Sequence, residues 1–198
     1  MSIESEDSST GVAGAVRDWW WSLQDERPGG ERNPMSDRGA LARLRRAATV
    51  AEAMAEEVTH DLWRRLPGDL RKEKNLPRVA LIAHVLAHVR ANVDRHPMAA
   101  LGRQSPDDED SAKLKPIRFR RLLAAREDKD LMDQMRRLVA LADGEINVGV
   151  LGASLLYWND ATRTRWAFEY FAAGAAAPRR AGTSSTANST TAVNGTAP

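Results

Sequence analysis

Residues 77–96 read PRVALIAHVLAHVRANVDRH, and this stretch decides the fold class that the sequence predicts. Pro77 suits the first turn of a helix because its φ is already fixed at a helical value. Apolar side chains then repeat at the spacing of one helical face: Val79, Ile82, Ala83, Leu86, Val89 and Val93. The His96-Pro97 pair ends the pattern. The sequence therefore predicts a long buried helix from Pro77 to His96.

Helical patterns also precede this stretch. They cover 14–24, where Val16, Trp19, Trp20 and Leu23 share a face, then 39–49, and then 50–66. Ser36 or Asp37 is placed to cap the second of these helices. The Pro- and Gly-containing segment 25–34 is a loop.

Four more helices are predicted after Pro97. One opens at Pro116, one begins near Asp128, one runs through Val148, Leu151 and Leu155, and the last contains Trp166, Phe168, Tyr170 and Phe171. No window shows the period-two alternation of a strand. The sequence therefore predicts an all-α protein with two helical lobes.

Composition divides the chain further. The first residues are small and polar, and the last 25 are almost free of large apolar side chains, so neither end can build a core. We predict a disordered N-terminus (1–11), an N-terminal helical lobe (12–97), an acidic linker loop (98–112), a C-terminal helical bundle (113–173) and a disordered low-complexity tail (174–198).

Several kinds of chemistry are excluded or unsupported. The chain has no Cys, so a disulfide, a thiolate metal site and a Cys nucleophile are impossible. The sequence contains no Gly-rich phosphate loop, no apolar signal segment, and no run approaching the ~18 apolar residues of a membrane span. We expect a cytoplasmic protein without membrane contact, without a cofactor and without enzymatic activity.

His84 and His88 stand four residues apart, a spacing that can hold a metal ion. The zinc-protease form of this motif needs a Glu beside the first His, but position 85 is Val, and no third ligand is evident. We therefore predict no metal site and place both histidines on a polar helix face; the alternative is a helical metal-dependent enzyme centred on this pair.

The densest positive charge lies in residues 113–137, which carry nine basic and four acidic side chains. Amphipathic helices over this segment would turn their apolar faces inward and leave a row of guanidinium groups in solvent. Guanidinium is planar and donates in a fork that matches phosphate, so the row suits a polyanion. The alternative is an ordinary solvated face supported by pairs such as Asp133 and Arg137.

The second half of the chain contains LGRQS (101–105), IRFRRLLAAR (117–126), QMRRLV (134–139), INVGVLGASLLYWND (146–160) and TRWAFEYF (164–171), in that order. The first half contains WWWSLQ (19–24) and RGALARLRRA (38–47). Together these blocks resemble the CasB family, the small subunit of the type I-E CRISPR Cascade surveillance complex.

The resemblance implies a two-lobed all-α fold with no catalysis. It implies contacts with the Cascade backbone and large subunits, with the guide RNA, and with the target and displaced DNA strands. A second copy would pack head to tail. The family role is to stabilise the R-loop, which agrees with an Arg-rich face that reads phosphate rather than base edges.

Carried over by local match, the nucleic-acid-binding candidates are Arg45, Arg46, Arg78, Arg103, Arg118, Arg121, Arg126, Arg136, Arg137 and Arg163. Arg126 follows Phe119 by seven residues, which would place it on the apolar face of a continuous helix. It can bind nucleic acid only if the helix ends before it. The segment Asn159–Ala161 departs from the basic residues often found there in the family. Trp158 and Trp166 lie at core spacing, which favours packing over base stacking.

A second hypothesis comes from a different class of protein. Trp19, Trp20 and Trp21 would form an exposed cluster on a helical adaptor that binds only protein, and the basic groups would meet acidic partner surfaces.

Overall fold

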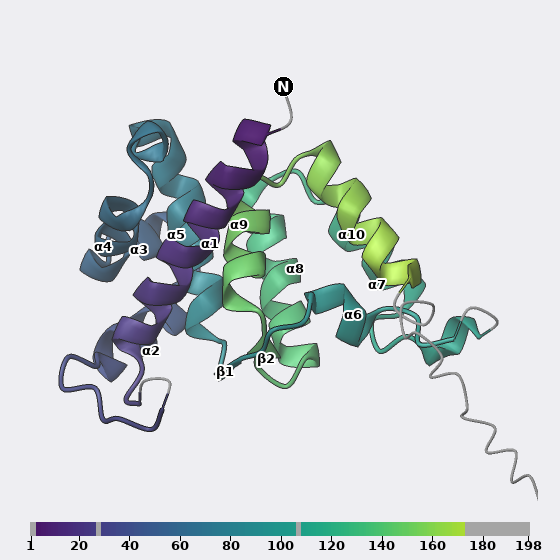
Figure 1. Ribbon diagram of the computed structural model, residues 1–198, viewed down its shortest axis with the longest axis horizontal. Coiled ribbons are helices and arrows are strands. Elements are labelled where there is room, and N and C mark those ends of the chain that lie inside the picture. Colours follow the sequence, from purple (N-terminus) through teal and green to yellow (C-terminus); the bar gives the residue numbers. More distant parts are fainter. Residues whose placement is uncertain (1–2, 27–28, 106–107, 173–198) are drawn as a thin grey trace, which may run out of the picture.

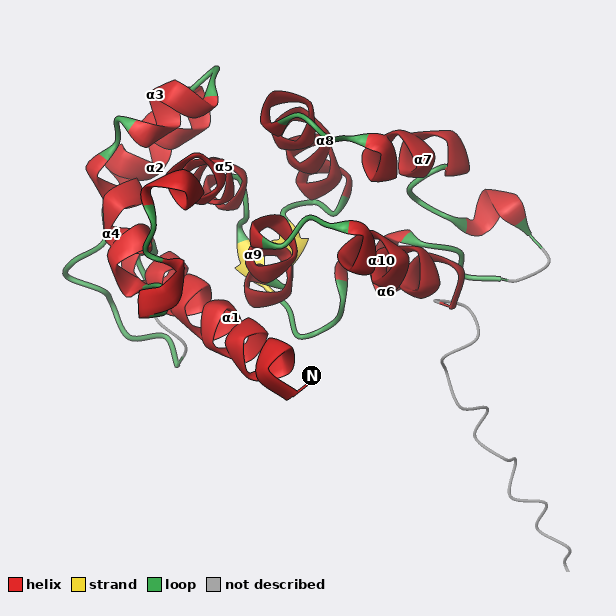
Figure 2. Ribbon diagram, turned by 90° about the horizontal axis from the view of Figure 1, so that it is seen from above, coloured by secondary structure: helices red, strands yellow, loops and turns green. Residues whose placement is uncertain are grey.

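The computed structural model describes residues 3–26, 29–105 and 108–172 (Figures 1 and 2). Its α-helices are α1 (Ile3–Leu23), α2 (Arg38–Arg46), α3 (Val50–Met54), α4 (Glu57–Arg65), α5 (Leu76–Ala87), α6 (Pro97–Leu101), α7 (Pro116–Ala124), α8 (Asp128–Leu141), α9 (Val148–Leu156) and α10 (Asp160–Ala172). Short 3-10 turns cover η1 (Gly68–Leu70), η2 (Glu73–Asn75) and η3 (Glu109–Ser111), and two-residue strands cover β1 (Ala91–Asn92) and β2 (Glu145–Ile146). The predicted all-α class is confirmed.

We predicted disorder at both ends of the chain, and the structure describes only part of the first of these segments. Helix α1 begins at Ile3, inside the N-terminal segment 1–11 for which we predicted disorder. The predicted tail 174–198 lies outside the described residues. No helix among the described residues is long and apolar enough to cross a membrane.

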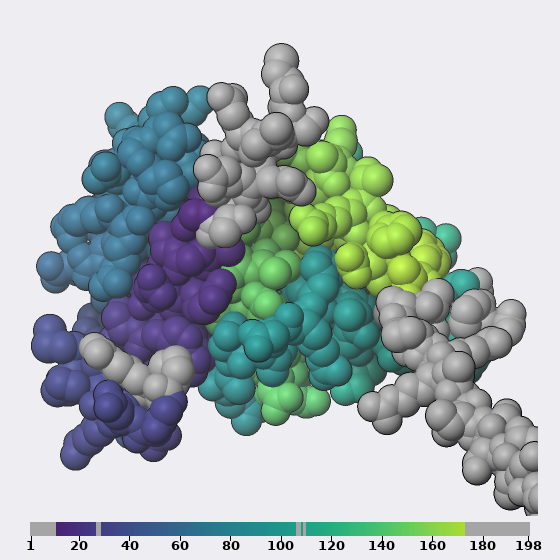
Figure 3. Space-filling model, in the orientation of Figure 1, coloured from purple at the N-terminus to yellow at the C-terminus, as the bar shows by residue number. Residues whose placement is uncertain are grey.

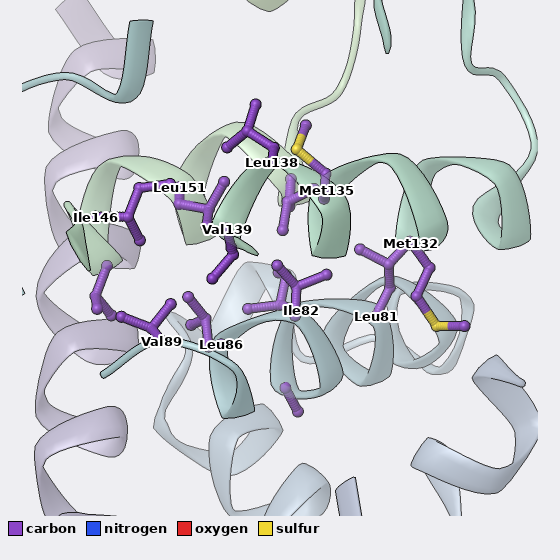
Figure 4. Close-up of a cluster of buried hydrophobic side chains, with 14 of the residues drawn as sticks. Leu81, Ile82, Leu86, Val89, Met132, Met135, Leu138, Val139, Ile146 and Leu151 are labelled. Carbon is purple, nitrogen blue, oxygen red and sulfur yellow. The ribbon is translucent and has the colours of Figure 1, made fainter. Parts of the chain in front are cut away.

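Helix α5 is the centre of the core. Its residues from Val79 to Ala87 are all buried, and α2, α3, α4, α8 and α9 pack around it. Figure 4 shows one of these contacts, where Leu81, Ile82 and Leu86 of α5 face Met135 and Val139 of α8. A helix that is apolar on every side can be stable only when neighbours surround it, which explains its central place.

Helix α1 crosses α9, and two glycines allow the close approach. A Cβ on Gly149 would lie 2.9 Å from the Ala13 carbonyl oxygen, and one on Gly152 would lie 2.5 Å from a Val16 methyl carbon. Both distances are shorter than real carbon contacts, so only glycine fits.

The helices form a larger and a smaller group (Figure 2). The larger group contains α1 to α5 with α8 and α9, and the smaller one contains α6, α7 and α10, joined to the first where α7 meets α8. Helices α8 and α9, which we expected in the C-terminal lobe, therefore pack on α1 and α5 from the expected N-terminal lobe.

Helix α5 ends at Ala87, so its predicted continuation to His96 is wrong. The backbone N–H groups of Arg90 and Ala91 donate instead to the Gly144 carbonyl, and β1 pairs with β2 in parallel. Gly144 has a φ of +76°, which a glycine adopts without strain. A two-residue strand has no period, so no sequence pattern could announce it.

The predicted helix over 50–66 is also divided. Helix α3 ends at Met54 and α4 starts at Glu57, and between them Glu56 accepts a hydrogen bond from Arg43 Nε at 2.7 Å. The cap of α2 is Asp37, whose side chain accepts from the Ala40 N–H at 2.7 Å.

The tryptophans lie inside the fold. Trp19 and Trp20 are each 1% exposed, and their indole N–H groups donate to the carbonyls of Val58 and Leu86. The hypothesis of an exposed Trp cluster is therefore wrong, because the rings anchor α1 on α4 and α5. Trp158 and Trp166 are buried as predicted.

Candidate nucleic-acid interface

Helix α7 presents the first row of basic groups. Pro116 opens it, and Phe119 and Leu122 are buried. The same periodicity leaves three guanidinium groups in solvent, those of Arg118, Arg120 and Arg121. None of the three makes an ion pair with a residue that the structure describes. The row of exposed guanidinium groups predicted for this helix is therefore present, and no described carboxylate neutralises it.

Helix α8 presents Arg136 and Arg137 on the two flanks of its outer face. Arg136 lies 3.7 Å from Asp133, which also receives Lys129 at 3.4 Å. Arg137 is exposed and has no ionic partner in the described part of the chain. Helices α7 and α8 lie together along the side of the molecule away from α1 (Figure 2).

Arg45 of α2 reaches the end of α5, where its Nε donates to the Ala87 carbonyl. Its neighbour Arg46 is exposed and pairs with no described residue. The pKa of His88 is lowered to about 4, first by burial and then by the positive charges of His84, Arg136 and Arg45. Arg45 and Arg136, which are 91 residues apart in the chain, therefore share one neighbourhood around His88.

Two of the predicted arginines are engaged within the fold. Arg78 Nη2 lies 2.8 Å from Asp128 Oδ1, and both side chains are half-buried, so the pair ties the first turn of α5 to the first turn of α8. The Arg163 side chain is 12% exposed, pairs with Asp160 at 2.7 Å and also reaches the Trp158 carbonyl. Both guanidinium groups are already paired and partly covered, so they offer less to an outside phosphate than the exposed arginines do.

Arg103 and Arg126 lie toward the smaller group of helices. The Arg103 guanidinium lies 5.2 Å from the centre of the Phe171 ring. Arg126 is exposed because α7 ends at Ala124, which meets the condition set by its spacing. It pairs with Asp160 at 3.2 Å, so Asp160 binds both Arg126 and Arg163.

The structure thus brings Arg45, Arg46, Arg118, Arg121, Arg136 and Arg137 to the surface on α2, α7 and α8. It leaves Arg78 and Arg163 only partly exposed and paired with Asp128 and Asp160. Arg120 was left out of the predicted set, although it is exposed beside Arg121. The exposed rings of Phe168 and Phe171 were also missed. Their positions on α10 differ from those of the buried Trp166 and Tyr170, and this spacing could have indicated that the two rings face solvent.

The His84 and His88 pair is not on a polar face, contrary to the prediction. His84 is 2% exposed, and its Nδ1 lies 2.8 Å from the Leu44 carbonyl oxygen. The described residues contain no group of three or more side chains that could hold a metal ion. Two arginines beside the pair also oppose a cation there.

Exposed basic helices on an all-α scaffold are a feature of many proteins that bind nucleic acid. Over residues 40–171 the chain matches the sequence profile of CRISPR-associated protein Cse2, and the chain belongs to that family. All ten predicted arginines lie within the matched residues.

A chain in the crystal structure of E. coli Cascade bound to a PAM-containing dsDNA target has a similar fold. The TM-score is 0.54 and the identity is 17%, and the match covers 83% of this chain and 96% of that one. No curated protein matches the chain.

Proposed function

We propose that this chain is the non-catalytic small subunit of a type I-E Cascade complex and stabilises the R-loop through the arginines of α2, α7 and α8. Family membership supports a place in Cascade. The observation that carries the nucleic-acid role is that α2, α7 and α8 hold exposed guanidinium groups without an acidic partner among the described residues: Arg46, Arg118, Arg120, Arg121 and Arg137.

Phosphate contact accounts for this arrangement. A strand displaced from any target has no fixed sequence, so a protein that holds it must read backbone charge. Exchanging a DNA duplex for an RNA–DNA heteroduplex is nearly balanced in free energy, so a few backbone contacts are enough to favour it. The unpaired arginines supply such contacts without first breaking an ion pair.

The partners follow from the same proposal. They are the backbone and large subunits of Cascade, the guide RNA, the target and displaced strands, and a second copy arranged head to tail. The chain would work in the cytoplasm.

The test is charge reversal in the assembled complex. The double variant Arg136→Glu with Arg137→Glu should shorten the R-loop lifetime and weaken DNA binding without unfolding the subunit. The affinity of this variant should also depend less on salt. The slope of log K against log salt concentration should become shallower by about 0.7 to 0.9 for each lost phosphate contact.

A matched control makes the same charge change elsewhere. Arg65 at the end of α4 and Arg71 after η1 are also exposed. The variant Arg65→Glu with Arg71→Glu should leave the R-loop lifetime close to that of the wild type. An unchanged lifetime in the α8 variant, or equal losses in both, would contradict the proposal.

A further inference from the structure

Helix α10 carries two aromatic rings on its solvent side. Phe168 is 69% exposed and Phe171 is 53% exposed, whereas Trp166 and Tyr170 of the same helix are fully buried. Residues three apart lie on one side of a helix, about 4.5 Å apart along its axis. The helix runs along the outer edge of the molecule (Figure 3). The two rings therefore form one apolar surface that faces solvent.

Most of this surface lies outside the core, although the Phe171 ring meets the buried Tyr170 ring edge-on at 5.0 Å. The Phe119 ring stacks on Tyr170, with ring centres 3.9 Å apart, and meets Phe171 only edge-on at 6.4 Å. Single exposed apolar residues are common, but adjacent exposed rings mark a contact site.

Two arginines lie near the rings, and Glu169 between Phe168 and Phe171 carries a negative charge. The Arg103 guanidinium lies 5.2 Å from the centre of the Phe171 ring, a cation–π geometry. The Arg103 N–H donates to the Tyr170 carbonyl at 2.8 Å, which holds the arginine at the end of α10. Arg165 is exposed one turn before Phe168. Phe119 of α7 meets the Phe171 ring at 6.4 Å, and Arg118 and Arg120 precede and follow Phe119 in the chain.

We propose that Phe168 and Phe171 form a stacking platform for bases of a single-stranded nucleic acid whose phosphates are held by Arg103 and Arg165. Every base has a π face, so rings bordered by cations bind single strands of any sequence. A purely apolar protein partner would bury these guanidinium groups at a cost, which favours the polyanion. This inference rests on the proposed function and adds base contacts to its phosphate contacts.

The test compares two strands and two variants of the full chain. The probes are a mixed-sequence single-stranded DNA and an abasic strand of equal length, which keeps the phosphates and lacks the bases. Phe168→Leu with Phe171→Leu keeps an apolar side chain and removes the rings. Phe168→Tyr with Phe171→Tyr keeps the rings and serves as the matched control. Fluorescence anisotropy gives the Kd of each pair across a salt series.

The wild type and the tyrosine variant should bind the base-bearing strand about tenfold or more tightly than the abasic strand. The leucine variant should lose this preference and keep its salt slope, because its phosphate contacts are intact. Equal affinity of the wild type for both strands, or a preference retained by the leucine variant, would overturn the platform and leave the phosphate contacts standing.

Two other results would also be decisive. If the leucine variant binds both strands like the wild type but no longer assembles with Cascade subunits, the surface is a protein contact and the platform is overturned. If the wild type binds neither strand at low salt, the platform is overturned, whereas the proposed function is decided separately by the R-loop lifetime of the assembled complex.

Discussion

The rings of Phe119 in α7 and Tyr170 in α10 stack face to face, with centres 3.9 Å apart and planes inclined by 5°. The Tyr170 hydroxyl also donates to the Leu114 carbonyl at 2.7 Å. Both side chains are buried. This pair joins α7, which carries the Arg row, to α10, which carries the exposed rings.

Truncating the stack should destabilise the protein. Phe119→Ala removes a buried ring and leaves a cavity, with an expected loss of about 3–5 kcal/mol in the free energy of unfolding. Tyr170→Phe keeps the stack and should lose only about 1 kcal/mol, the net value of one hydrogen bond. Urea denaturation followed by circular dichroism measures both. Equal losses in the two variants would mean that stacking is not the main contribution.

The crossing of α1 and α9 should not tolerate a methyl group at Gly152. A Cβ there would lie 2.5 Å and 3.0 Å from the two Val16 methyl carbons. Gly152→Ala should therefore destabilise the fold by about 1–3 kcal/mol.

Gly14 in α1 is the matched control, because a Cβ there would meet no atom within 4 Å. Gly14→Ala should raise the stability by about 0.5–1 kcal/mol, since alanine favours helix. A stable Gly152→Ala protein would show that the two helices separate easily.

Asp160 should act as a competitor of phosphate. It is an exposed carboxylate that binds both Arg126 and Arg163. If Arg126 contacts nucleic acid, as predicted from the sequence, Asp160→Asn should tighten single-strand binding and steepen the salt slope by roughly 0.7.

Asp61→Asn makes the same charge change on α4, where Asp61 pairs with Arg64. It should alter binding much less than Asp160→Asn. Equal gains from the two variants would show that only the total charge matters and that the Asp160 pairs do not.

Stability should fall as the pH drops below the ordinary histidine value. Burial chiefly lowers the pKa values of His88 and His96 to about 4, from 6.5. Between these limits the unfolded chain takes up protons that the folded chain does not, so acidification favours unfolding. Below about 4 both states are protonated, and this contribution stops changing.

Unfolding measured from about pH 7 to about pH 4.5 tests this, with His88→Gln as the comparison. The variant should lose less stability across the window, because it removes one of the titrating groups. Hydrogen bonds from Arg38 and Lys115 lower the pKa values of the Asp25 and Asp110 carboxyl groups, so these groups stay charged in the folded protein across the window. An identical pH profile for the variant would contradict the assignment to His88.

Local patterns predicted the helices well. Pro116 and Asp128 begin their helices where expected, and Asp37 caps α2, because caps and proline act within one turn of the chain. The patterns did not predict the end of α5 at Ala87, where the Gly144 carbonyl takes the backbone hydrogen bonds of Arg90 and Ala91. They also placed the Trp19–Trp20 pair on the surface in one hypothesis, since a local pattern cannot show which neighbour covers a face.

The sequence by itself determined the all-α class, the apolar face of each helix and the density of arginine on α2, α7 and α8, because all three depend on spacing within one element. Only the tertiary structure decided which arginines remain available. Asp128 engages Arg78 across 50 residues, and Asp160 engages Arg126 across 34. An ion pair depends on distance in space, and the packing of helices that are remote in sequence sets that distance.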